Sequence, residues 1–258
     1  MGALLRIQAL ATNTFREAIR NKLLYTLLGF SFLMIASGVL LATLSYVEMD
    51  EILQDMGMSA IRFFSAGIAT FVGIGLIHNE VDRRTIFTIL SKPVSRSEFL
   101  LGKWAGLTFT VWLQLALMAL AFAGVSGLAG APLSSDHFLA IALIGLELMV
   151  LVAIATLFSA FTTPMLAALF TLGFWMIGHL TRDLHALSQQ SDLEGVAAAG
   201  SWVFQLLPDF EVFNKTLEAV HGLPIGAGEV SLAIVYAVGY TGCTLLLGSM
   251  IFSRRDFK

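Results

Sequence analysis

One polar stretch, residues 78–103, concentrates the charged and hydroxyl side chains that could bind a partner. It reads HNEVDRRTIFTILSKPVSRSEFLLGK and contains five of the chain's fifteen Lys and Arg residues. Pro93 divides the stretch, because the residue before a proline avoids the helical conformation. Ser95 and Glu98 have the spacing of a capping box, which predicts that a second helix starts there. We therefore predict a helix, a break and a capped helix, which together form a rigid protrusion suited to a soluble partner.

The alternative for this stretch is a solvated loop whose charges only fix the topology of the chain. For any single arginine that interpretation is the better one. A topology signal needs only cations, however, and has no use for a proline break followed by a capped helix. We therefore favour docking for the arrangement as a whole. The candidate docking residues are Glu80, Arg83, Arg84, Thr85, Lys92, Pro93, Ser95, Arg96, Ser97 and Glu98.

A second candidate is Glu147, which lies midway along an apolar segment. A carboxylate at the centre of a bilayer costs roughly 2.5–3.5 kcal/mol on insertion scales. It should therefore face protein or water, be protonated, or pair with another group. Two interpretations stay open: a contact in a transport pathway or at a dimer interface, and a protonated, hydrogen-bonded packing residue.

The sequence lacks the patterns of several enzyme classes. Its one Gly-Lys pair, Gly102–Lys103, has no earlier glycine at the spacing of a phosphate-binding loop. The protease patterns H-E-x-x-H and G-x-S-x-G do not occur. His179 and His185 stand six apart with no evident third ligand, so we interpret them as interface histidines rather than metal ligands. We expect no catalytic site, no metal site and no cofactor bound by this chain.

Composition places the chain in the membrane. Of 258 residues, 57% are apolar and 13% are charged, and the mean hydropathy is +0.83, whereas soluble domains average roughly 25% charged residues. The single cysteine, Cys243, excludes an intramolecular disulfide. We predict an all-α integral membrane fold that forms one transmembrane domain over residues 1–258. Six segments have about the 20 residues that a span needs: 23–46, 60–78, 104–128, 138–160, 164–181 and 230–252.

Lys and Arg residues set the expected orientation. Residues 1–22, the 78–103 stretch and the C-terminal tail hold twelve of the fifteen, whereas Arg62, Arg182 and Lys215 fall on the other side. We therefore predict that both termini are cytoplasmic, as six spans require.

The N-terminal segment 1–22 is predicted to be an amphipathic helix in the cytoplasmic interface of the membrane. The alternative is a helix that packs on its own protein. The segment 182–229 is too polar to cross the membrane, and its aromatic content argues for an ordered outer segment. The apolar stripe of the N-terminal helix comprises Leu4, Ile7, Ala11, Phe15 and Ala18.

Three short motifs resemble one family of membrane proteins. NEVDRRTIFTILSKPVSRSEFLLGKW, at 79–104, resembles the loop between the second and third spans of ABC-2 type permeases, the membrane subunits of one class of ABC exporters. TFREAIRNKLLY at 14–25 and LLPDF at 206–210 resemble parts of the same family. The branch that looks most similar contains the permeases of copper-processing and gliding-motility systems.

The resemblance implies a dimer of twelve spans, formed with a second copy or a homologous permease. Two ATPase subunits, which hold ATP and Mg, would bind on the cytoplasmic side. A coupling helix at about Ser95 to Leu101 would sit in a cleft on each ATPase, flanked by Glu80, Arg83 and Arg84. Closure of the ATPases would switch the pathway between inward and outward access. A bacterial inner membrane and the direction of export are also implied by the resemblance.

Two alternatives differ in class. A gradient-driven secondary transporter or channel predicts several charges inside the membrane, and only Glu147 is clearly mid-span. A non-transporting scaffold driven by an ATPase would use the same coupling loop. The 20 phenylalanines fit a hydrophobic pathway and a lipid-facing surface equally well, so the substrate stays open.

Overall fold

The computed structural model describes residues 2–43, 49–82, 95–189, 195, 201 and 207–254. Within these residues every regular element is helical, which confirms the predicted all-α fold. The elements are α1 (Ala3–Ala18), α2 (Lys22–Ala42), α3 (Met49–Asp82), α5 (Arg96–Leu128), α6 (Ser135–Ser159), α7 (Pro164–Gln189), the 3₁₀ turn η1 (Phe210–Phe213), α9 (Thr216–Val220) and α10 (Ala227–Arg254).

Six of these helices are long and apolar enough to cross a membrane, as the sequence predicts. The second differs most from its prediction, because α3 begins at Met49 rather than near residue 60. Asp50 and Glu51 lie in its first turn, where carboxylates interact favourably with the helix dipole. The candidate spans are Lys22–Ala42, Met49–Gly75, Ser97–Leu128, Ser135–Ser159, Pro164–Leu184 and Ala227–Phe252.

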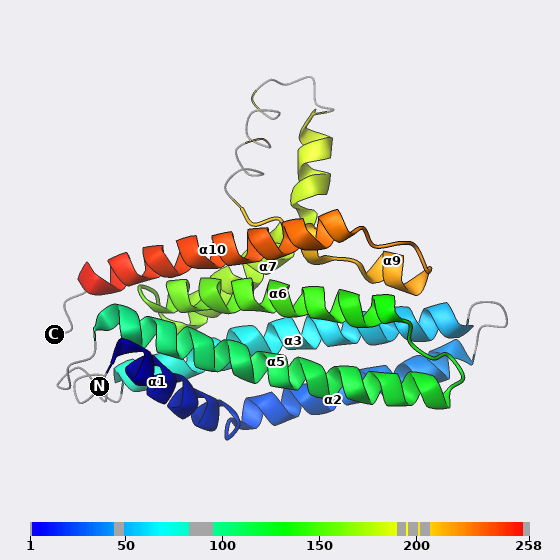
Figure 1. Ribbon diagram of the computed structural model, residues 1–258, viewed down its shortest axis with the longest axis horizontal. Helices are drawn as coiled ribbons and strands as arrows, with labels where there is room; N and C mark the ends of the chain where they lie inside the picture. The colour runs from blue at the N-terminus through cyan, green and yellow to red at the C-terminus, as the bar shows by residue number, and fades with distance from the viewer. Residues whose placement is uncertain are drawn as a thin grey trace.

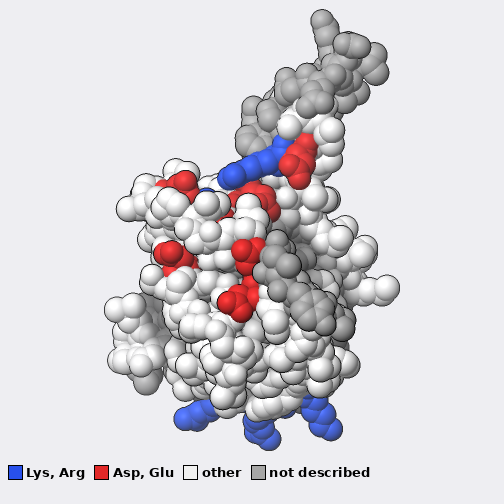
Figure 2. All heavy atoms as spheres, turned by 90° about the vertical axis from the view of Figure 1, so that its right-hand side faces the viewer, with Lys and Arg blue, Asp and Glu red and all other residues white. Residues whose placement is uncertain are grey.

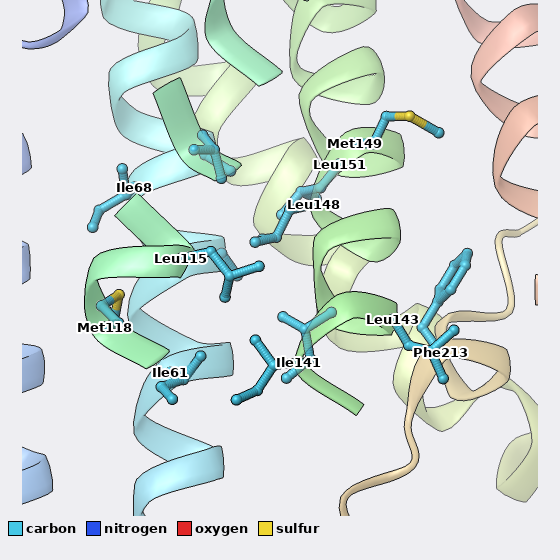
Figure 3. Packing of buried hydrophobic residues seen from close by; sticks show 14 of the residues in the cluster. Ile61, Ile68, Leu115, Met118, Ile141, Leu143, Leu148, Met149, Leu151 and Phe213 are labelled. Carbon is cyan, nitrogen blue, oxygen red and sulfur yellow. The ribbon is translucent and has the colours of Figure 1, made fainter. Parts of the chain in front are cut away.

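The helices run lengthwise side by side, with both termini at one end (Figure 1). Helix α6 lies at the centre, and most of its residues are buried. Figure 3 shows Ile61 and Ile68 of α3, Leu115 of α5 and Ile141 of α6 within the same apolar core. The last turns of α7 stand out from the body of the bundle (Figure 1).

The opposite end of the bundle carries acidic side chains (Figure 2). Among them are residues in the first turns of three helices: Glu51 of α3, Glu218 of α9 and Glu229 of α10. Lys215 contacts both Glu218, at 2.8 Å, and Glu229, at 2.5 Å. This distribution matches the predicted outer side, and the orientation in the membrane stays a prediction.

Helix α1 packs lengthwise on α5. Two glycines of α5 allow the close approach, since a Cβ on Gly106 would lie 2.5 Å from the carbonyl oxygen of Ala11, and one on Gly102 would lie 2.6 Å from Cβ of Leu10. Ala18 is fully buried, whereas Leu4 is 82% exposed. Most of the apolar stripe therefore faces protein, as the alternative interpretation expects, and the helix's place in the membrane interface stays a prediction.

Candidate functional site

The start of α5 is the part of the predicted docking stretch that the structure describes in detail. Ser95, Ser97 and Glu98 lie there, Glu80 lies in the last turns of α3, and Arg96 is the first residue of α5. The other predicted residues lie outside the described part of the chain: Arg83, Arg84, Thr85, Lys92 and Pro93.

The predicted capping box forms at the start of α5. The hydroxyl of Ser95 accepts a hydrogen bond from the backbone N–H of Glu98 at 3.2 Å, and Glu98 Oε2 accepts from the backbone N–H of Ser95 at 3.0 Å. These bonds satisfy donors that a helix otherwise leaves without partners. The direction in which the chain enters α5 is thereby fixed.

Glu98 also joins the capping box to α1. Its Oε1 accepts from Nη2 of Arg6 at 2.6 Å and its Oε2 from Nε of Arg6 at 3.1 Å, in a two-pronged ion pair. The hydrogen bond to Glu98 raises the pKa of the Arg6 guanidinium above its usual value. One carboxylate thus caps α5 and anchors the beginning of α1.

The other end of α1 is anchored to α5 as well. The ammonium group of Lys103, on a side chain that is almost fully buried, lies 3.6 Å from Oε2 of Glu17. It also lies 6.0 Å from the ring centre of Phe99, within the range of a cation–π contact. Phe15 packs edge-on against Phe109 at 5.1 Å. Helices α1 and α5 therefore form one unit at the base of the predicted docking stretch.

A buried cluster of polar side chains joins α3, α6 and α7. Glu147 of α6 has no exposed surface. Its Oε2 lies 3.2 Å from Nε of Arg62 on α3, and its Oε1 accepts a hydrogen bond of 2.7 Å from the indole N–H of Trp175 on α7. Nε2 of His179, one turn further along α7, lies 3.4 Å from the same Oε1. A carboxylate inside the membrane domain is thus surrounded by three nitrogen atoms.

This cluster bears on two predictions. Arg62 was counted on the outer side; it lies midway along the candidate span Met49–Gly75 and pairs with Glu147. The expectation that Glu147 must face protein or water, be protonated, or pair is met by pairing. His179 belongs to the same cluster. The spacing of the histidines in the sequence gives no sign of this contact.

The cluster continues to the outer segment. The ring of Phe210 stacks on His179 with 5.7 Å between centres. Arg182 donates to Asp209 at 2.8 Å, and the hydroxyl of Tyr236 on α10 accepts from the Asp209 backbone N–H at 2.9 Å. Asp209 and Phe210 of the LLPDF motif therefore pack against α7 next to the buried cluster.

An apolar groove runs along the first half of α7. It consists of two adjoining cavities of about 250 and 490 Å³, which share Phe71 of α3 and Leu172 of α7 in their walls. Trp175 lines the smaller cavity, while its indole nitrogen bonds Glu147. The buried carboxylate thus orients a side chain in the groove wall without facing the groove itself. The remaining wall residues are Leu27, Phe63, Phe64, Ala66, Gly67, Ile74, Gly75, Pro164, Met165, Leu166, Ala168, Leu169 and Met176.

Six long apolar helices define a multi-pass membrane protein. A family model described as "ABC-2 family transporter protein" matches residues 8–257. Because this match covers nearly the whole sequence, the chain belongs to the ABC-2 transporter family. No curated protein matches it. The family consists of membrane domains of ABC transporters, so the chain is an ABC permease rather than an enzyme, and its branch within the family stays a prediction.

Proposed function

We propose that the chain is the membrane subunit of an ATP-driven exporter in the bacterial inner membrane. Two copies, or this chain and a homologous permease, would assemble with two ATPase subunits that hold ATP and Mg. The ATPases would dock on residues 78–103, and closure of the ATPases would drive alternating access.

The junction of α1 with the start of α5 is the observation that carries this proposal. A helix that transmits force needs a fixed entry and a firm attachment, and here Ser95, Glu98 and Arg6 supply both. A displacement at the start of α5 would then move α1 with it. A loop that only set topology would have no use for a two-pronged ion pair to another helix.

A route from this junction into the bundle follows α5. The helix is continuous from Arg96 to Leu128. Two of its tryptophans donate hydrogen bonds to backbone carbonyls of α6, Trp104 to Met149 at 3.3 Å and Trp112 to Gly145 at 2.8 Å. These carbonyls flank Glu147 in the sequence. We propose that movement of α5 reaches the groove through α6, Glu147 and Trp175.

The gradient-driven alternative is favoured by one observation. Arg62, Glu147 and His179 supply the several intramembrane ionisable groups that such a transporter requires. The three groups contact one another, however, and the family match places the chain among ABC proteins. We therefore keep this function second.

Co-purification with a candidate ABC ATPase co-expressed with this chain tests the proposal. The triple variant Arg83→Glu, Arg84→Glu and Arg96→Glu reverses three charges in the docking stretch. A matched control reverses three exposed charges near the far end of α1, at Arg16, Arg20 and Lys22. Both variants must insert and fold like the wild type, as judged by gel filtration.

We expect the wild type and the control to retain the ATPase in equal proportion to the permease, and the triple variant to lose it. Loss in both variants would mean that net positive charge, rather than the docking stretch, attracts the ATPase. A wild type that binds no ATPase in lipid discs would contradict the proposed function and bring the gradient-driven alternative to first place.

A further inference from the structure

The two ring nitrogens of His179 both face oxygen atoms. Nδ1 lies 2.9 Å from the carbonyl oxygen of Trp175, which can only accept a hydrogen bond, so Nδ1 carries a hydrogen. Nε2 lies 3.4 Å from Oε1 of Glu147. A neutral imidazole has one N–H, and with that hydrogen on Nδ1 it would direct the lone pair of Nε2 at a carboxylate. A favourable contact between Nε2 of His179 and Oε1 of Glu147 therefore requires one further proton between the two atoms.

We propose that Glu147 and His179 form a proton-binding site inside the membrane domain. The other neighbours of the carboxylate locate the proton. Trp175 donates to Oε1 at 2.7 Å, and the guanidinium of Arg62 lies 3.2 Å from Oε2. A hydrogen-bond donor on Oε1 and a guanidinium beside Oε2 favour the ionised carboxylate, so the proton resides on Nε2 of His179.

The charged groups around His179 come from each element that packs against it. Glu147 of α6 attracts a proton to the ring and Arg62 of α3 repels it. Arg182, one turn further along α7, is paired with Asp209 beside Phe210. Glu147 lies closest and is fully buried, where water screens its charge little.

His137 provides an internal comparison, since it is buried and its hydrogen-bond partners are neutral, with Asp136 as its charged neighbour in the chain. Its Nδ1 accepts from the backbone N–H of Ser134 at 3.2 Å, and its Nε2 lies 3.1 Å from the amide oxygen of Gln54. A neutral ring with its hydrogen on Nε2 satisfies both contacts. The same chain thus holds one buried histidine that needs one ring proton and one partly buried histidine that needs two.

Proton binding at this site would regulate how α7 is held. With the proton present, His179 and Trp175 both attach α7 to Glu147 through N–H groups. When the proton leaves, the lone pair of Nε2 faces the carboxylate, and only the indole bond of Trp175 is left between the two helices at this point. The affected part of α7 carries one wall of the apolar groove and the contact with Phe210.

Nitrogen-15 NMR of histidine-labelled protein in lipid discs tests the proposal. An imidazole of ordinary acidity is about one-tenth protonated at about pH 7.5. At that pH we expect His179 to carry hydrogen on both nitrogens in nearly all molecules and His137 to carry one hydrogen. The chain has five histidines, and the variants His179→Gln and His137→Gln assign the two signals.

Two further variants separate the proton site from a loss of folding. Glu147→Gln removes the negative charge, and we expect the second proton of His179 to be lost. Trp175→Phe keeps the charges and removes only the indole N–H, and we expect His179 to stay doubly protonated. Infrared spectroscopy shows whether the carboxyl of Glu147 holds a proton instead, which would also support a shared proton site.

A wild-type His179 with one hydrogen beside an ionised Glu147 would overturn the proposal. A His179 that stays doubly protonated in a folded Glu147→Gln variant would overturn it as well, because the carboxylate would then not hold the proton. The wild-type spectrum decides the question even where a variant fails to fold.

Discussion

Replacement of Gly106 by alanine should separate α1 from α5. An ideal Cβ at this position would lie 2.5 Å from the carbonyl oxygen of Ala11 and 2.7 Å from Cβ of Thr14. Ordinary van der Waals contact begins at 3.4 Å, so one helix must move by about 0.9 Å at this point. The obstructing oxygen belongs to the backbone of α1 and cannot turn away as a side chain could.

The expected cost follows from two opposing terms. Overpacking of a well-packed contact typically costs about 1–3 kcal/mol. Alanine also gains up to about 1 kcal/mol over glycine in the interior of a helix. Gly124, in the same helix, has no atom within 4 Å of its ideal Cβ, so Gly124→Ala should show the helix term alone. The difference between the two variants should therefore be about 1–3 kcal/mol.

Thermal unfolding of both variants in the same lipid discs measures this difference. In domains of about this size, 1 kcal/mol corresponds to roughly 2–4 °C in Tm. Spin labels on the exposed positions Gln8 and Leu113 should also report a wider distance distribution in Gly106→Ala. Equal Tm values and unchanged distances in the two alanine variants would refute the close α1–α5 contact.

Three further predictions concern the described polar contacts. Ser95→Ala removes the cap of α5 and should lower stability by about 1 kcal/mol, as thermal unfolding measures. Arg6→Glu and Glu98→Arg should each reduce stimulation of the partner ATPase, and the double exchange should restore part of it at low salt; no restoration would argue against a direct pair. Burial raises the pKa of Glu218, but the hydrogen bond from Lys215, a backbone hydrogen bond and the charge of Lys215 together lower it below 4.5. This contribution to stability is complete above a pH of about 4.5 and is lost as the pH falls further. When the pH is lowered from about 6 to about 4, the Tm of Glu218→Gln should therefore fall less than the Tm of the wild type.

The parts of the fold that sequence predicts well are those set by local rules. Span number follows from hydropathy and length, and the helix start at Ser95 follows from two residues three positions apart. Arg62 was taken as a mark of the membrane surface, so the second span was predicted to begin near residue 60, whereas the helix that contains it begins at Met49. A charge can instead lie deep in a span when a partner on another helix neutralises it.

The packing of α1 shows a second limit. Its stripe of apolar residues is compatible with a lipid surface and with a neighbouring helix, since both are apolar. The choice depends on Gly102 and Gly106, which lie in a different segment, at the end of the polar stretch and at the start of the third predicted span. Only the packing of the two helices in the structure shows that these glycines make room for α1. Periodicity within one segment carries no information on what lies against it.

The buried cluster has a positional role that stability alone does not explain. Removing two charges from water costs several kcal/mol for each ion, and well-packed apolar residues in their place are often as stable or more so. The arrangement of Trp175, His179 and Arg182 along one side of α7 gives three polar contacts that only one register of the helix can satisfy. An apolar α7 could slide or rotate against α6 and α3 with little change in free energy. We infer that the cluster sets the register of α7, and hence the groove beside it, at some expense in stability.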